Sequence, residues 1–268
     1  MLLAFDTSTS VASVALVTPP SAENSDEARL VAELTWRVGQ RHSTELLERL
    51  EWLLASAHAT MADLTGIAVA LGPGSFNGVR VALATAKALA FARNAPLIGT
   101  PTLDVVAWGY SAAHGANAGT ICAILEAGRG QVYAATYDAT ADAANWAPLD
   151  GYQVTTAAEL AGRLSGAAFF CGEMAPATRA TLAEALGGRF RSASPLEERR
   201  ASWLAELALA RVAHQRYDDA MALEPLYLRR PAITTSARHK AAAPEDAEQT
   251  RQREDAPKGE GTSDALRR

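Results

Sequence analysis

The chain has 268 residues and a mass of 28.2 kDa, of which 49% are hydrophobic and 21% are charged. This composition is ordinary for a globular protein and excludes a wholly disordered or collagen-like chain. The 25 basic side chains are outnumbered by 30 acidic ones, giving a net charge of -5. A broad basic surface for nucleic acid is therefore not expected, and any such contact must be local or shared with a partner.

The cysteine pattern and the N-terminus indicate the compartment. Cys122 and Cys171 lie far apart in apolar runs, which favours buried thiols over a disulfide, a zinc site or a nucleophile. Asp6 follows the N-terminus too closely for a secretory signal, and no run of about 18 apolar residues occurs in the sequence. We therefore expect a cytoplasmic protein without a membrane-spanning helix.

The first part of the chain alternates strand-like and helix-like patterns. Apolar runs predict strands at residues 2–5, 11–17, 67–71 and 96–99, and alternation predicts a further strand at 30–38. Helices are predicted at 43–58, after the loop 72–78, and at 102–113. The core face of the first helix is expected to consist of Leu46, Leu47, Leu50, Leu53, Leu54 and Ala57. Ser75 or Asn77 can cap the second helix.

The pattern restarts after a loop of glycine, asparagine and histidine at residues 114–119. Strands are predicted at 120–126, 131–137 and 167–171, and helices at 156–164, 176–186 and 202–217. A strand-strand-helix-strand-helix order that occurs twice predicts an α/β fold of two related lobes. We expect the first lobe at 1–113, completed by 200–231, and the second lobe at 114–199.

The C-terminal segment has a different composition. From residue 237 to 268 the only large apolar side chain is Leu266, among many charged residues. Such a segment cannot bury enough surface to order itself, so we expect a disordered tail.

The turn at residues 6–10 carries the first candidate chemistry. Asp6 offers a carboxylate for a hydrated cation, and Thr7 and Ser8 offer hydroxyl and backbone N–H groups for phosphate. A hydroxyl-rich turn that satisfies its own backbone is the alternative, and both interpretations stay open.

The loop Gly72-Pro-Gly-Ser-Phe-Asn-Gly-Val-Arg80 joins a strand directly to a helix. Gly74 and Ser75 would place backbone N–H groups of a helix N-terminus toward an anion. The loop is not a Walker A motif, because the nearest lysine, Lys87, lies deep in the helix. A purely structural turn remains the alternative.

The string from Ala70 to Ala90 resembles the TsaB (YeaZ) family, and the start Leu3-Ala-Phe-Asp-Thr-Ser-Thr-Ser10, Gly130-Gln-Val-Tyr133 and Glu224-Pro-Leu-Tyr-Leu-Arg229 resemble its other landmarks in the same order. The resemblance covers about residues 1 to 231. It implies two actin-like lobes of the ASKHA, ribonuclease H-like type. Asn77 in place of threonine, Glu126-Ala-Gly-Arg129 in place of an Asp-Ala-Arg type sequence, and the charged tail are departures from the family pattern.

The resemblance also implies a function. Family members belong to the bacterial machinery that forms N6-threonylcarbamoyladenosine at position 37 of tRNAs. This chain is then expected to be a non-catalytic scaffold and activator, a dimerization subunit that pairs with a TsaD-like catalytic subunit, while a TsaE-like ATPase joins the assembly. A homodimer is a further expected partner state, and tRNA would be met only through the complex.

Two enzyme readings compete with this one. Asp6 and Glu126 could form the two-carboxylate cleft of an ATP-dependent kinase or carbamoyl-type transferase, with Arg129 contacting an anion across the cleft or simply exposed. Against it, Gly172 stands alone where an adenosine site needs a glycine pair, so at most weak ATP or ADP binding and no cofactor are expected. A metallopeptidase is disfavoured because no two histidines are four residues apart. No metal site is expected.

The expected partner interface lies on two helices of the first lobe. Trp52 lies off the leucine face with Glu48 and Ala55, and an exposed tryptophan is a plausible anchor. The next helix carries a ridge of small residues at four-residue intervals, Gly78, Ala82, Ala86 and Ala90, which would let another helix approach closely. The alternative is that this ridge packs on the protein's own sheet.

Overall fold

The computed structural model describes residues 1–20, 27–38, 42–115, 119–194 and 199–229. The predicted tail at 237–268 lies outside these residues, as does the end of the segment 200–231. Among the helices of the described residues, none is both long and apolar enough to cross a membrane.

The first sheet contains five strands in the order β3-β2-β1-β4-β5. They are β1 (Leu2–Asp6), β2 (Val11–Thr18), β3 (Arg29–Arg37), β4 (Gly66–Ala70) and β5 (Leu97–Thr100). β1 pairs antiparallel with β2 and parallel with β4, and β4 pairs parallel with β5. All five are predicted by the sequence, four from apolar runs because they are buried along nearly their whole length, and the half-buried β3 from alternation.

The second sheet repeats this plan in the order β10-β9-β6-β7-β8. Its strands are β6 (Thr120–Gly128), β7 (Gln131–Asp138), β8 (Gln153–Thr156), β9 (Ala168–Glu173) and β10 (Phe190–Ser192). As in the first sheet, three consecutive antiparallel strands are followed by two strands parallel to the first of them, here β9 and β10. The mixed α/β class and the repeated order are confirmed.

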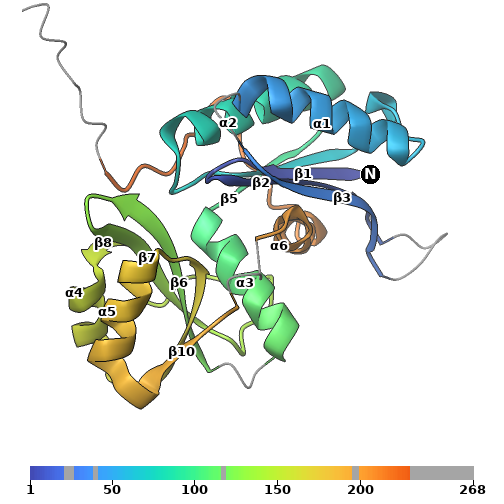
Figure 1. The fold of residues 1–268 in the computed structure, drawn as a ribbon. Helices are drawn as coiled ribbons and strands as arrows, with labels where there is room; N and C mark the ends of the chain where they lie inside the picture. The colour runs from blue at the N-terminus through green and yellow to red at the C-terminus, as the bar shows by residue number, and fades with distance from the viewer. Residues whose placement is uncertain (21–26, 39–41, 116–118, 195–198, 230–268) are drawn as a thin grey trace, which may run out of the picture. The chain divides into compact units, whose positions relative to one another are not determined.

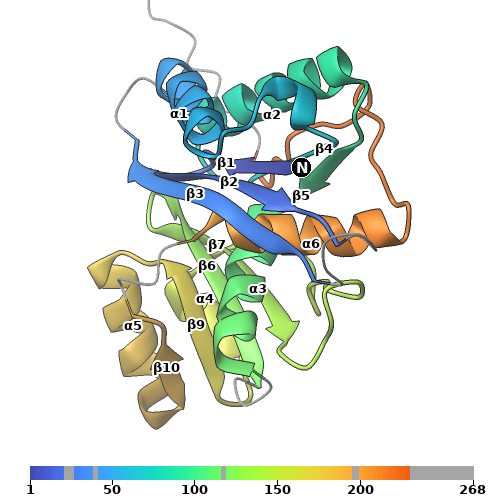
Figure 2. The same ribbon diagram turned by 90° about the vertical axis from the view of Figure 1, so that its right-hand side faces the viewer.

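The helices cover both sheets (Figure 1). α1 (His42–Ser56) and α2 (Phe76–Arg93) lie on one face of the first sheet, and α6 (Ala201–Ala213) lies on the other. α3 (Thr102–His114) packs on the second sheet and against α6, so these two helices lie between the sheets, as the rotated view also shows (Figure 2). α4 (Ala157–Arg163) and α5 (Pro176–Leu186) cover the outer face of the second sheet.

The hydrophobic core has three parts. One lies under α1 and α2, one lies under α4 and α5, and the largest joins the facing sides of both sheets through α3 and α6. Leu103 of α3 and Leu204 of α6 are fully buried in this shared part. The division into lobes at residue 113 stays a prediction. It assigns α3 to the first lobe, whereas α3 packs on strands of the second sheet.

Two local predictions have different outcomes. Leu46, Leu50, Leu53 and Leu54 are buried as expected, but Leu47 is 52% exposed, so its place in the core face was wrong. Leu47 lies about 100° around the helix from Leu46, at the edge of the face and away from the sheet. Ser75 caps α2 by accepting a hydrogen bond from the N–H of Gly78 at 3.3 Å, as predicted.

Candidate functional site

The turn at residues 6–10 and the loop before α2 lie side by side, because each follows one of the adjacent parallel strands β1 and β4. The backbone N–H of Ser75 donates to the carbonyl oxygen of Ser8 at 2.5 Å. The Thr7 hydroxyl donates to the carbonyl oxygen of Gly78 at 2.7 Å. Hydrogen-bonding groups of both candidate phosphate loops are therefore used to hold the loops to each other.

Two glycines permit this close contact. A Cβ atom at Gly74 would lie 2.0 Å from the carbonyl oxygen of Ser8, and one at Gly78 would lie 2.0 Å from that of Thr7. No side chain fits at such distances, so the absence of a Cβ is required at both positions. The glycines of the loop thus serve contact between two backbone segments.

The Asp6 carboxylate is completely buried at the end of β1. Its Oδ1 atom accepts a hydrogen bond from the backbone N–H of Ser8 at 2.7 Å. Its Oδ2 atom lies 2.5 Å from Nε of Arg199, whose side chain is only 3% exposed. Oδ1 of Asp6 is therefore hydrogen-bonded by the turn itself, whereas Oδ2 is in an ion pair, without a hydrogen bond, with a guanidinium from a distant part of the chain.

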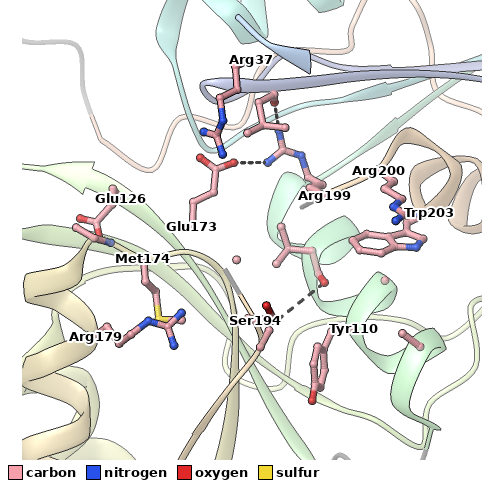
Figure 3. Close-up of a pocket in the computed structure, with 18 of the residues that line it drawn as sticks. Arg37, Tyr110, Glu126, Glu173, Met174, Arg179, Ser194, Arg199, Arg200 and Trp203 are labelled. Carbon is pink, nitrogen blue, oxygen red and sulfur yellow. Dashed lines mark hydrogen bonds and ion pairs between the residues drawn. The ribbon is translucent and has the colours of Figure 1, made fainter. Parts of the chain in front are cut away.

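Arg199 contacts both sheets (Figure 3). Its Nη2 donates to the carbonyl oxygen of Val11 at 2.7 Å and to the hydroxyl of Thr9 at 3.2 Å, both from the first sheet. Its Nη1 lies 3.1 Å from Oε1 of Glu173, at the end of β9 in the second sheet. An arginine keeps its charge when buried, so it permanently supplies the positive charge that Asp6 needs there.

A cavity of about 300 Å³ lies beside these loops. Four of the predicted nucleotide or phosphate contacts line it, namely Ser8, Gly74, Ser75 and Glu126, together with Thr9, Ser10, Leu125, Ala127, Tyr133 and Glu173. Glu126 accepts a hydrogen bond at 2.7 Å from the backbone N–H of Ala175, just before α5. The structure therefore brings these four predicted residues together.

The other three predicted contacts lie elsewhere. Asp6 and Thr7, the first two residues of the turn, are buried and do not line the cavity. Arg129 is exposed at the tip of the β6–β7 hairpin, where it takes a left-handed backbone conformation with φ of 57°. Its alternative reading as an exposed turn residue fits this position.

Two residues that hold the site together were not predicted. Glu173 and Arg199 are far from the turn in sequence, and Arg199 follows the acidic pair at positions 197 and 198, so it resembles an ordinary surface charge. Nothing in the local sequence marks Arg199 as a partner of Asp6, or Glu173 as a partner of Arg199. The folded structure brings Arg199 next to Asp6 at the end of β1 and next to Glu173 at the end of β9.

A second buried carboxylate lies between the sheets. Asp104 of α3 is 7% exposed, and its Oδ1 accepts hydrogen bonds from the hydroxyls of Tyr137 at 2.7 Å and Tyr152 at 2.9 Å. Burial raises the pKa of Asp104 to about 6, although the hydrogen bonds from the two tyrosines lower it in part. Burial also raises the pKa of Tyr137. Asp104 belongs to the core and not to the cavity at the turn.

Within the part of the chain that the structure describes, no group of three or more His, Cys, Asp or Glu side chains could hold a metal ion. Cys122 and Cys171 are buried and are not joined in a disulfide, as predicted, and burial raises the pKa of Cys122 to about 12. His239 lies outside the described residues.

The predicted interface helices need a correction. Ala82, Ala86 and Ala90 are at most 4% exposed, and Gly78 is buried against Thr7, so the small-residue ridge packs on the protein's own first sheet. The assignment of that ridge to an exposed face was wrong. Small residues at this spacing permit close packing of any neighbour, and here the neighbour is the sheet.

The rest of the α1–α2 surface is exposed. Trp52 is 56% exposed, as is expected for an anchor, and Glu48 and Ala55 are also exposed. Leu47 is 52% and Phe91 is 89% exposed on the same pair of helices. Apolar side chains therefore remain on the outer surface of α1 and α2.

Comparison with known proteins identifies the group to which the chain is related. It is 33% identical over 136 residues to the tRNA threonylcarbamoyladenosine biosynthesis protein TsaB of Escherichia coli (strain K12), covering 51% of this chain and 54% of that protein. It is also 33% identical over 137 residues to the protein of the same name from Bacillus subtilis (strain 168), with the same coverage. The chain thus spans about half the length of the curated relatives that it matches.

A family model described as "TsaD: tRNA N6-adenosine threonylcarbamoyltransferase" matches residues 37–185, which is more than half of the chain. The chain belongs to this family, as a member of the TsaB (YeaZ) type. A Pseudomonas aeruginosa protein described as similar to peptidase YeaZ is 25% identical in its crystal structure, with a TM-score of 0.68, and the match covers 85% of this chain and 99% of that one.

A second structure, YeaZ from Pseudomonas aeruginosa, has a TM-score of 0.63 at 24% identity and shows the shared fold. The TsaB (YeaZ) resemblance and the actin-like, ribonuclease H-like fold predicted from the sequence are therefore confirmed. The family match begins at Arg37 and ends near the end of α5, so it includes the loop before α2 and the β6–β7 hairpin. Arg199 lies beyond it.

Proposed function

We propose that this chain is a non-catalytic subunit of the machinery that forms N6-threonylcarbamoyladenosine at position 37 of tRNAs. The names of its TsaB relatives support this process, and the role of a scaffold and activator is what the resemblance to the TsaB (YeaZ) family implies. The observation that carries the proposal is the ion pair between Asp6 and Arg199, at 2.5 Å in a fully buried position.

The ion pair bears directly on catalysis. Phosphoryl transfer in this kind of fold relies on metal ions that neutralise phosphate charge, and a carboxylate must be available to hold them. In this chain Oδ1 of Asp6 is hydrogen-bonded and Oδ2 is in an ion pair, and the loops at the turn bond to each other. ATP or ADP binding is therefore proposed to be weak or absent, and the alternative of a kinase or carbamoyl-type transferase that uses Asp6 and Glu126 is not favoured.

The partners follow from this role. We propose a TsaD-like catalytic subunit as the direct partner, a TsaE-like ATPase that joins the assembly, and contact with tRNA only through the complex, in the cytoplasm. The corrected interface is the exposed α1–α2 surface that includes Leu47, Trp52 and Phe91. A homodimer would compete for the same apolar side chains.

Reconstitution tests the function. The purified chain alone should neither turn over ATP nor modify tRNA, and addition of TsaD-like and TsaE-like proteins with threonine, bicarbonate, ATP and unmodified tRNA should yield the modified nucleoside, detected by mass spectrometry. Omission of this chain should abolish the product. ATP turnover by the chain alone that is lost on Asp6→Asn would reject the non-catalytic role.

Substitutions test the interface. Trp52→Ala and Phe91→Ala should each weaken binding of the TsaD-like subunit by about 2 kcal/mol, because exposed aromatic anchors dominate such contacts. Met221→Ala is the matched control, since Met221 is 89% exposed outside these helices. If calorimetry gives equal affinities for all three variants, the interface lies elsewhere.

A further inference from the structure

The chain continues after α6 as a segment that runs along the first sheet and reaches the second (Figures 1 and 2). Residues 218–229 of this segment belong to no helix or strand, and we call them the strap. The strap contacts the edge of the first sheet, the loop before α2 and the β6–β7 hairpin of the second sheet. One segment of irregular backbone thus connects both sheets.

Asp218 fixes one end of the strap to β5, the edge strand of the first sheet. Its backbone N–H donates to the carbonyl oxygen of Leu97 at 2.9 Å, and its Oδ2 accepts from the N–H of Gly99 at 2.7 Å. Arg211 of α6 donates to Oδ1 of Asp218 at 2.9 Å and to the carbonyl oxygen of Gly99 at 2.8 Å. The strap end thus satisfies backbone groups of a sheet edge and is held there by an ion pair.

The middle of the strap is held by apolar packing and by one backbone hydrogen bond. Leu223 packs against the core under α1 and α2. The N–H of Leu226 donates to the carbonyl oxygen of Leu71, just after β4, at 2.8 Å. Tyr227 stacks on Phe76, the first residue of α2, with 5.4 Å between the ring centroids. The strap therefore follows the first sheet as far as the start of α2.

Arg229 holds the other end of the strap to the second sheet. Its Nη1 donates to the carbonyl oxygen of Ala127 at 3.2 Å, and its Nη2 donates to Oε1 of Gln131. Both acceptors belong to the β6–β7 hairpin, and both are neutral, unlike the carboxylate of Asp218 at the first end. Hydrogen bonds from a guanidinium are weaker to neutral acceptors than to a carboxylate, so the hairpin end is the easier one to release.

The cavity of about 300 Å³ beside the turn has walls from both sheets, with Ser75 on the side of the first and Ala127 on the side of the second. Tyr227 contacts Phe76, which directly follows Ser75. Arg229 contacts Ala127. Because Tyr227 and Arg229 are only two positions apart, the chain between them spans at most about 7 Å. The strap therefore restricts how far the hairpin can move from the loop before α2.

We propose that the strap is a conformational restraint with a fixed end at Asp218 and a releasable end at Arg229, and that Arg229 sets the separation between the two walls of this cavity. The core shared through α3 and α6, and the contacts of Arg199, join the sheets elsewhere. Release of Arg229 therefore frees the hairpin without separating the sheets. The restraint acts within this chain alone, so it is independent of the proposed function.

Hydrogen exchange of the full-length chain, followed by mass spectrometry, tests the restraint. Arg229→Met should speed amide exchange in hairpin residues 126–132 about tenfold, because the hairpin loses two hydrogen bonds to the strap. Arg216→Met is the matched control, since Arg216 also donates to a backbone carbonyl, that of Ala144 at 3.2 Å, but lies before the strap. The control should leave exchange of the hairpin unchanged.

A change of the acceptor should act in the opposite direction. Gln131→Glu gives Arg229 a carboxylate, so the hairpin end becomes an ion pair and exchange of residues 126–132 should slow about threefold. The same substitution in the Arg229→Met background should not slow exchange, because the donor is gone. A hairpin stabilised only by its own strands would not show this dependence on Arg229.

Spin labels measure the separation directly. Ala84→Cys on the exposed side of α2 and Arg129→Cys at the exposed tip of the hairpin place one label on each side. Cys122 and Cys171 are buried, and a labelled chain without the new cysteines corrects for any reaction at them. Arg229→Met should broaden the distribution of distances between the labels and shift it to longer values, whereas Arg216→Met should not.

Two results would overturn the proposal: Arg229→Met leaves hairpin exchange and label distances unchanged, or Gln131→Glu has the same effect on exchange with and without Arg229. Circular dichroism checks that each variant is folded, and Gln131→Glu alone still decides the matter if Arg229→Met does not fold, because unchanged exchange in that variant rejects the restraint. These measurements need no partner, whereas reconstituted tRNA modification tests the proposed function, so the two proposals can fail separately.

Discussion

Replacing Arg199 by methionine tests the central feature of the site. Methionine has a similar length and no charge, so the variant removes the guanidinium while filling much of its space. Asp6 is then left as a fully buried carboxylate whose Oδ2 has lost its partner at 2.5 Å. Glu173 loses a partner at 3.1 Å as well, but its side chain is 35% exposed and water can replace the contact.

The expected loss of stability is large. Breaking a buried ion pair by removal of one partner costs about 3–5 kcal/mol, because the remaining charge is buried without compensation. Two further hydrogen bonds, to Thr9 and to the carbonyl oxygen of Val11, are lost at the same time. For a protein of this size, such a loss lowers the melting temperature by roughly 10 °C.

Urea unfolding followed by circular dichroism measures this cost, and a double variant isolates its electrostatic part. Asp6→Asn with Arg199→Met removes both charges and should recover about half or more of the loss, since no uncompensated charge remains. Arg163→Met on the exposed surface of α4 should change stability by less than about 0.5 kcal/mol. A loss below about 1 kcal/mol for Arg199→Met, or no recovery in the double variant, would refute the reasoning.

Three other changes have expected outcomes. Because burial raises the pKa of Asp104 to about 6, its favourable contribution is complete below pH 3.8 and is lost as the pH rises through 6. Asp104→Asn should therefore gain about 1.4 kcal/mol relative to the unmodified chain between pH 5 and pH 8 in urea titrations, and a constant difference would contradict the assignment. Gly78→Ala should destabilise by about 3 kcal/mol because its Cβ would meet the Thr7 carbonyl, whereas Gly162→Ala, with open space around it on α4, should stabilise by about 0.5 kcal/mol. Truncation after Ser236, outside the described residues, should leave the melting temperature unchanged, and a drop of several degrees would contradict the reading of the tail.

The elements of the fold were largely predictable because most of them are buried. An apolar run marks each of β1, β2, β4 and β5, and helical spacing marks α1 to α3, so the sequence pattern follows directly from burial. β8 and β10 escaped prediction since they have only four and three residues and are mostly half-buried. Short strands with mixed exposure leave no periodic signal.

The small-residue ridge on α2 shows a different limit. Four-residue spacing of glycine and alanine predicts that something packs closely on that face, and this is correct. The sequence does not say whether the neighbour is a partner helix or the chain's own sheet. Here Ala82 and Ala86 lie on the sheet with no exposed surface, and the exposed large apolar residues of the two described helices are Leu47, Trp52, Phe76 and Phe91.

The turn at residues 6–10 shows why chemistry is harder to predict than fold. Its residue types suit a cation and a phosphate, and a motif read along the chain would assign them those ligands. Whether the turn binds such ligands depends on the positive charge beside Asp6. That charge comes from Arg199, 193 positions later in the sequence. A buried carboxylate needs a positive partner whatever its source, and a resident guanidinium leaves no deficit for a metal ion to fill. The ligand preference of the turn is therefore set by tertiary structure, through the segment that leads into α6.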